Sequence, residues 1–329
     1  MQSMIYPWQQ TQWQNVRQQL QADRLPHGLL LAGPQGMGKL HFAQQLMASL
    51  LCQKVDNEGL ACGACSSCLL LAAQTHPDLS VLQAEAPGKA IKVDDVRRLG
   101  AQLNLTSQYG GYRVALIVDA HDMNINAANS LLKTLEEPTG GTILILVSSS
   151  PQKLPITVRS RCQAMAFKGP TTQQAVSWLE GQGVVPADVS GLLGLAHGAP
   201  LLALELQQGE LLAHHQLLIS SLLGVIKNQP VVDRAEQLHK LPLPYLLNWL
   251  YDWVQDLIKL AQCGESATLV HEAWKKDLRQ LATRCRLQGL YGYLDQLVKC
   301  KQLQTFPLNT QLLWEDLLLS WNKLINKTG

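Results

Sequence analysis

A glycine-rich stretch near the amino terminus has the residue types of a phosphate-binding loop. It begins at Gly33 and reads GPQGMGKL. In the P-loop pattern, glycines allow backbone N–H groups to turn toward a phosphate, the lysine reaches the outer phosphates, and a following serine or threonine binds Mg²⁺. Gly33, Gly38 and Lys39 satisfy the pattern and Gly36 adds a flexible position, but Leu40 has no hydroxyl. The stretch therefore predicts a phosphate cradle that lacks a metal ligand.

An acidic residue closes the strongly apolar run 113–119. In P-loop enzymes an aspartate at this strand end helps to hold Mg²⁺, and Asp119 fits that position. The next residue is Ala120, so an acid that would orient the attacking water is missing there. Because residues 40 and 120 both lack the groups that hydrolysis requires, we expect no independent ATPase activity. The alternative for Asp119 is a polar strand end that caps the following turn.

Four of the eight cysteines form a C-x9-C-x2-C-x2-C pattern: Cys52, Cys62, Cys65 and Cys68. Thiolates at this spacing can converge on one ion in a tetrahedral site, and in a reducing compartment a metal is favoured over disulfides. All four positions around the ion would be filled, so we predict structural zinc. An iron–sulfur cluster takes the same ligands, and unpaired buried cysteines are a further alternative. His76 is another candidate ligand, although the proline after it is typical of a turn.

The elements that would position these residues alternate along the first half of the chain. Apolar runs alternate with amphipathic stretches, which is typical of a parallel sheet covered by helices on both faces. The predicted strands are 27–32, 79–82, 113–119, 142–147 and 163–167. The predicted helices are 9–24, 40–51, 93–105 and one that Asn126 caps and Pro138 ends.

The pattern changes to helices only after residue 168. We predict three domains: an α/β P-loop domain at 1–168 with the cysteine insertion at 52–77, a small helical domain at 169–209, and an all-helical domain at 210–329. Leucines and tryptophans are frequent in the last domain, where an ordinary helical core accounts for most of them.

The composition limits the class of protein. The chain has 329 residues and is 47% hydrophobic, so it can bury a sizeable core. A net charge of +2 argues against a strongly basic nucleic-acid-binding protein. Apolar runs such as 143–147 are too short to span a bilayer, and no basic-plus-apolar signal opens the sequence. We expect a soluble cytoplasmic protein with no membrane partner.

Two further stretches complete a resemblance to a known family. Residues 159–162 read RSRC, and residues 129–138 read NSLLKTLEEP. With the cysteine insertion that follows the glycine-rich stretch, they resemble the AAA+ clamp-loader subunits of bacterial DNA polymerase III, in which SRC is a motif and the second stretch a signature helix. The resemblance covers the first two predicted domains by motifs and the third only by its helical character.

The resemblance implies a fold and a role. The fold would be an AAA+ P-loop domain with a zinc-binding insertion, followed by a helical lid domain and a collar domain that packs with other subunits. Arg161 would act in trans as an arginine finger on ATP bound by a neighbouring subunit, with Arg159 in a secondary role. The implied partners are the gamma and tau ATPase subunits and the delta subunit. The assembled complex would engage the sliding clamp and primed DNA, and polymerase activity would lie in another subunit.

Within this family, the chain resembles a subunit that is not a motor. Motor subunits have an intact P-loop and an acid pair on the third strand, and this sequence has neither. Leu201 stands where the family's sensor-2 arginine is expected. The opening tripeptide, which begins at Tyr6 and reads YPW, also fits the non-motor type. Because Lys39 is retained, weak nucleotide binding without turnover remains an alternative.

Two other functions also remain as alternatives. An active AAA+ ATPase with atypical residues would need another hydroxyl or a water at the metal and an acid such as Asp122 in place of residue 120. A zinc-dependent nucleic-acid-binding module would need a basic, aromatic surface on the cysteine insertion. That insertion contains Lys54 as its only Lys or Arg and has no aromatic residue, so the sequence disfavours this function.

Overall fold

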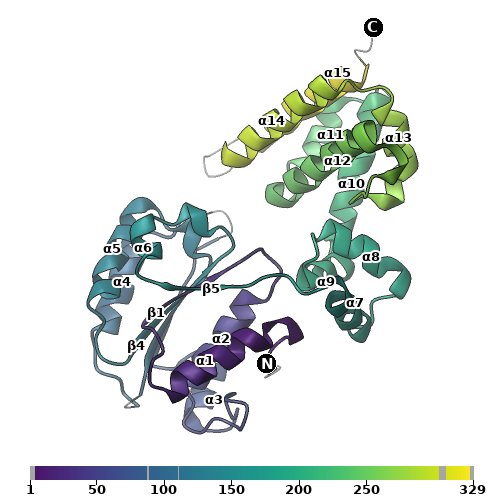
Figure 1. Cartoon of the computed structure of the whole chain (residues 1–329). Helices are drawn as coiled ribbons and strands as arrows, with labels where there is room; N and C mark the ends of the chain where they lie inside the picture. The colour runs from purple at the N-terminus through teal and green to yellow at the C-terminus, as the bar shows by residue number, and fades with distance from the viewer. Residues whose placement is uncertain (1–3, 87–88, 110, 304–308, 327–329) are drawn as a thin grey trace. The chain divides into compact units, whose positions relative to one another are not determined.

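The structure, a computed structural model, describes residues 4–86, 89–109, 111–303 and 309–326. The chain divides into two compact units, Met1–Gln174 and Ala175–Gly329. The first unit contains both strands and helices, and the described residues of the second unit form helices and turns (Figure 1). The finer prediction of a separate helical domain at 169–209 stays a prediction.

The first unit is built on a five-stranded sheet with the order β2-β3-β4-β1-β5, and every pairing in it is parallel. The strands are β1 (Gly28–Ala32), β2 (Leu79–Leu82), β3 (Arg113–Ile117), β4 (Thr142–Ser148) and β5 (Gln163–Ala166). Every residue of β3 and β4 is buried. Burial on both faces explains why these strands are continuous apolar runs. The sheet confirms the predicted α/β architecture, a parallel sheet in the first part of the chain.

Helices cover both faces of this sheet. They are α1 (Gln10–Gln21), α2 (Lys39–Leu51), α3 (Ser66–Ala72), α4 (Val93–Leu103), α5 (Ile125–Glu136) and the single turn α6 (Ile156–Arg159). Figure 1 shows α4 and α5 on one side of the sheet and α1 and α2 on the other. Leu30, Ala115 and Leu144 join the core that α4 and α5 cover. The other side packs against α2, which contacts β1, β3 and β4.

The start of α5 differs from the prediction. Asn124, not Asn126, is the N-cap, and its side-chain oxygen accepts a hydrogen bond from Ala127 N at 2.8 Å. A short polar side chain at the N-cap satisfies one of the N–H groups that the first turn leaves unpaired. The helix then runs to Glu136, two residues before Pro138.

The second unit is a leucine-rich helical bundle. Its helices are α7 (Thr172–Gly181, which begins just before the unit), α8 (Pro186–Leu195), α9 (Pro200–Gln208), α10 (Leu211–Ile226), α11 (Val231–Leu238), α12 (Leu243–Cys263), α13 (Lys275–Ala282), α14 (Leu287–Leu303) and α15 (Thr310–Asn326). Trp253, Trp314 and Trp321 are fully buried. The indole N–H of Trp321 donates to Leu222 O at 3.1 Å. These tryptophans therefore belong to the core of the bundle.

No single helix among the described residues has the length and apolarity needed to cross a membrane. Helices α8 and α9 have that length and apolarity only when they are taken together, and the chain bends by 112° between them.

Candidate functional site

The four predicted cysteine ligands lie together beside the end of α2. All four sulfur atoms lie within 4.8 Å of one another. The Sγ–Sγ distances are 3.6 Å for Cys52–Cys62, 3.7 Å for Cys52–Cys68, 3.9 Å for Cys62–Cys68 and 4.0 Å for Cys52–Cys65. A tetrahedron with metal–sulfur bonds of about 2.3 Å has sulfur–sulfur edges of about 3.8 Å. The cluster therefore has the dimensions of a four-thiolate site and can hold a metal ion.

His76 lies outside this cluster and forms hydrogen bonds that connect the cysteine insertion to its surroundings. Its Nδ1 accepts a hydrogen bond from Asp78 N at 3.1 Å, so its Nε2 carries the proton toward Ser67 Oγ at 2.8 Å. Ser67 in turn donates to Leu51 O at 2.5 Å. These bonds join α3 of the cysteine insertion to the end of α2 and to the turn before β2. Burial lowers the pKa of His76, which favours the neutral ring that this pattern requires.

The glycine-rich stretch, residues 33–40, connects β1 to α2 and is called the phosphate loop below. Gly36 and Gly38 have φ of 73° and 81°, which residues with a side chain rarely adopt. The ammonium of Lys39 turns back within the loop and donates to Pro34 O at 2.6 Å. Only 6% of Lys39 is exposed, and burial lowers the pKa of its ammonium to about 8. The lysine that would reach a phosphate is thus engaged with its own loop.

The amino-terminal segment covers the same loop. The indole N–H of Trp8 and the carboxamide of Gln9 both donate to Met37 O, at 3.1 and 2.8 Å. A Cβ added at Gly38 would lie 2.8 Å from atoms of both Tyr6 and Gln9. Sequence reasoning singled out the YPW tripeptide without assigning a contact to it, and it did not identify Gln9. Glycine at position 38 is therefore needed for this close approach as well as for its backbone angle.

The acidic end of β3 lies beside the phosphate loop. Asp119 follows the strand with a positive φ of 46°. Its negative charge favours the charged form of Lys39 and so partly offsets the lowering of the Lys39 pKa by burial. Ala120 is fully buried and belongs to the core that α4 and α5 cover. Burial raises the pKa of Asp122, and the nearby Asp119 adds to the rise. Position 120 is thus occupied by a packing residue that faces the core.

The two predicted arginines lie where α6 ends and the chain leads into β5, in residues 159–162, called the finger loop below. One Nη of Arg161 lies 2.6 Å from Glu136 Oε1, and the other donates to Thr157 O at 3.1 Å. The Arg161 side chain is 37% exposed. Arg159 is partly buried, and its Nε has no hydrogen-bond partner among the described residues. Sequence reasoning did not identify Glu136 as a partner, although it quoted the helix that contains it.

The finger loop and the phosphate loop lie at opposite ends of the sheet. Strands β1 and β5 are parallel, with Leu29 opposite Gln163, so Arg161 precedes the strand pair at its amino end. A Cβ added at Gly28 would lie 3.2 Å from Arg161 O. The phosphate loop begins at Gly33, about 16 Å further along the strand at about 3.3 Å per residue. Arg161 therefore does not reach the phosphate loop of its own chain.

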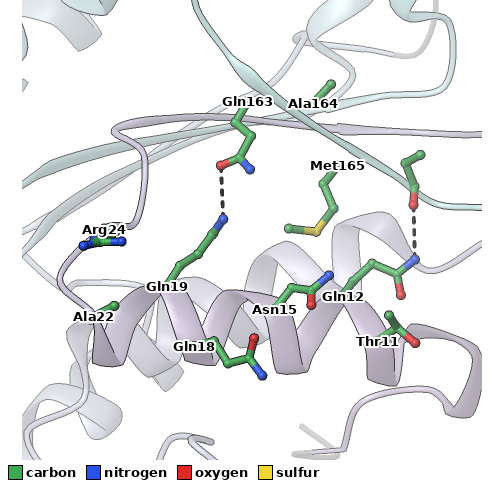
Figure 2. Close-up of a pocket in the computed structure, with 11 residues that line it drawn as sticks. Thr11, Gln12, Asn15, Gln18, Gln19, Ala22, Arg24, Gln163, Ala164 and Met165 are labelled. Atoms are coloured by element: carbon green, nitrogen blue, oxygen red, sulfur yellow. Dashed lines mark hydrogen bonds between the residues drawn. The ribbon is translucent and has the colours of Figure 1, made fainter.

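A polar groove of about 480 Å³ lies between α1 and the edge strand β5. Figure 2 shows the carboxamides of Gln12 and Gln19 reaching from α1 to the strand, where they donate to Ala166 O and to the Gln163 side-chain oxygen. The groove contains none of the residues that the sequence predicted for nucleotide or metal binding. Its lining includes no residue of the phosphate loop, of residues 159–162 or of the cysteine cluster.

Comparisons with known proteins agree with this architecture. The family model described as "DNA polymerase III, delta subunit" matches residues 8–171, and the model for the C-terminal part of that subunit matches residues 209–323. DNA polymerase III subunit delta' of Pseudomonas aeruginosa is 36% identical over 97% of this chain and 98% of its own length. The chain belongs to the family of DNA polymerase III delta' subunits. The delta' subunit of Escherichia coli K12 is 31% identical over 95% of this chain and 94% of its own length.

Membership of the delta' family confirms the resemblance to clamp-loader subunits of bacterial DNA polymerase III that the sequence showed. Among solved structures, a DNA polymerase III gamma-subunit-related protein of Thermotoga maritima is similar with a TM-score of 0.46 and 14% identity, over 94% of this chain and 99% of that one.

Proposed function

We propose that this delta' chain is a clamp-loader subunit that does not hydrolyse ATP itself and supplies Arg161 in trans to ATP on a neighbouring subunit. The observation that carries this proposal is the exposed Arg161 guanidinium at the end of the sheet opposite its own phosphate loop. An arginine supplied in trans stabilises charge that develops on the transferred phosphoryl group and contributes about 10³–10⁵ in rate. Arg159 would support the finger loop or contact the same neighbour.

The phosphate loop supports the non-hydrolysing half of the proposal. Leu40 provides no ligand for Mg²⁺, and Ala120 occupies a core position in place of an acid. Lys39 is bonded within its own loop, and Tyr6 to Gln9 cover the glycines. A triphosphate would have to displace these contacts before it could use Gly33, Gly36, Gly38, Lys39 and Asp119, the positions predicted for nucleotide.

The partners follow from the same role. The gamma and tau subunits would bind and hydrolyse the ATP, with the delta subunit in the same complex. A lid at 169–209, which begins at the end of the first unit, would be followed by a collar at 210–329 that holds the subunits together. The assembled complex, in the cytoplasm, would engage the sliding clamp and primed DNA.

We further propose that the cysteine cluster holds a structural zinc ion. The four sulfurs fill all four tetrahedral positions, so none is left for a substrate or a water. Native mass spectrometry of the purified chain is expected to show one zinc ion per chain. Cys65→Ser should abolish zinc retention, and Cys263→Ser, which removes an exposed cysteine outside the cluster, should preserve it. Iron and sulfide in place of zinc would contradict the assignment.

Steady-state ATP hydrolysis tests the proposed function at both ends of the sheet. The chain alone, with Mg²⁺ and primed DNA, is expected to show only background turnover. In a loader reconstituted with the motor and delta subunits, Arg161→Ala should lower turnover by about 10³-fold or more and leave assembly intact. Turnover by the chain alone that Lys39→Ala abolishes would establish the alternative, an active ATPase with atypical residues. Unchanged turnover of the Arg161→Ala complex would refute the role in trans.

A further inference from the structure

Arg161 has a charged partner that no sequence motif assigned to it. Glu136 is the last residue of α5, and its carboxylate lies 2.6 Å from one Nη of Arg161. The other Nη donates to Thr157 O at 3.1 Å. Because a guanidinium is planar, contacts at both Nη atoms fix the orientation of its plane. The arginine side chain is therefore held at two points before any neighbouring subunit binds.

We propose that Glu136 is a positioning residue that orients Arg161 for the ATP site of the neighbouring subunit; this inference rests on the proposed function. A guanidinium has five N–H donors in a rigid fork. One Nη of Arg161 donates a hydrogen bond to Thr157 O, and the other forms an ion pair with Glu136. The side chain is 37% exposed, which leaves other N–H groups of the guanidinium for phosphate oxygens. Glu136 can thus hold the arginine without occupying the whole of its binding face.

The element that carries Glu136 is well suited to this task. Helix α5 is capped by Asn124 and packs into the core through Leu131 and Leu135, both nearly fully buried. The Glu136 side chain is 48% exposed, so its ion pair with Arg161 contributes little to folding stability. Its main effect is on the conformational freedom of Arg161, because arginine loses much rotamer entropy when it is fixed. The ion pair with the end of α5 therefore restricts Arg161 before the neighbouring subunit binds, so less side-chain entropy is lost on binding.

The test compares Glu136→Ala and Glu136→Gln in the reconstituted loader. We expect Glu136→Ala to lower kcat for ATP by about fivefold to tenfold, the size of effect that follows from freeing one arginine side chain, with KM for ATP unchanged. Affinity of the complex for ADP–aluminium fluoride, which imitates the transition state, should fall by a similar factor, and affinity for ADP should not change. Glu136→Gln keeps an oxygen acceptor for Arg161 and should restore part of the rate.

The matched control is Glu85→Ala, which removes a 2.7 Å exposed ion pair with Lys92 elsewhere in the same unit and should leave kcat unchanged. Normal kcat for Glu136→Ala, together with loss of turnover for Arg161→Ala, would overturn the positioning role and leave the proposed function intact. A loss of assembly or a higher KM in Glu136→Ala would also overturn it, because either points to a structural role. Normal turnover for Arg161→Ala would overturn both.

Discussion

The two ends of the sheet in the first unit differ in how far their loops are covered by the rest of the chain. At the carboxyl end of β1, the phosphate loop is bonded to its own chain through Lys39, Trp8 and Gln9. At the amino end of β5, the finger loop presents a partly exposed guanidinium whose only charged partner within 4 Å among the described residues is Glu136. The same α/β frame thus keeps one loop closed and leaves the other accessible to a neighbour.

This difference indicates that ATP hydrolysis and the role proposed for Arg161 would depend on separate parts of the fold. Loss of hydrolysis would need only local changes, because the strands and helices around Leu40 and Ala120 are intact. The finger loop depends on the frame and not on the phosphate loop, since its position is set by α5, α6 and the start of β5. Under the proposed function, Arg161 could therefore serve a neighbouring subunit whether or not its own chain binds nucleotide.

The largest effect is expected for a substitution that keeps the positive charge of Arg161 but changes its shape. Arg161→Lys keeps one positive charge but loses the planar fork that matches phosphate oxygens. We expect turnover of the reconstituted loader to fall by about 10³-fold, close to the loss expected for a missing finger. Arg97→Lys, at an exposed arginine that pairs with Asp94 on α4, is the control and should retain full turnover. Full activity in Arg161→Lys would mean that charge alone is needed.

The next effect concerns the acid that is absent after β3. Ala120 is fully buried, so Ala120→Glu would force a carboxyl group into the core. We expect the free energy of unfolding to fall by about 3 kcal/mol, measured by urea denaturation of the isolated chain. Leu40→Ser, at a position 37% exposed, is the control and should change stability by less than about 0.5 kcal/mol. If Ala120→Glu were as stable as the parent, position 120 would not be committed to packing.

The features that the sequence predicted are those in which the signal is local. The apolar runs predicted the five strands, and the spacing from Cys62 to Cys68 predicted the cluster because ligands with two residues between them stay close in any compact turn. The cap of α5 was placed two residues late, because Asn124 and Asn126 have the same propensity and only the backbone distinguishes them. The partner of Arg161 and the cover of the phosphate loop join segments that are distant in the chain. No periodicity in a single sequence encodes such pairs.

A smaller effect is expected when the cover of the phosphate loop is weakened. A double variant, Trp8→Phe with Gln9→Ala, removes both donors to Met37 O and should lower the free energy of unfolding by about 2 kcal/mol. The chain should still show no ATP turnover, because Leu40 and Ala120 remain. Turnover in this variant would mean that the amino-terminal segment, and not the missing ligands, keeps the loop inactive. Gln10→Ala, next to the cover, is the control and should change stability less, since its carboxamide bond to Ile5 O is 3.4 Å long.

The smallest effect tests whether the phosphate loop is closed around Lys39. Burial lowers the pKa of Lys39 to about 8, so between about pH 8 and the ordinary lysine value of about 10.4 the unfolded chain binds a proton that the folded chain does not. The free energy of unfolding should therefore rise with pH in this window, by up to about 1 kcal/mol per pH unit relative to Lys39→Met, which lacks the titrating group. A bound triphosphate would favour the charged lysine and raise its pKa, so ATP should remove this rise if the loop accepts it. If ATP leaves this pH dependence unchanged, the phosphate loop is closed to nucleotide. If ATP removes it, the loop binds nucleotide, and the contrast between the two ends of the sheet is lost.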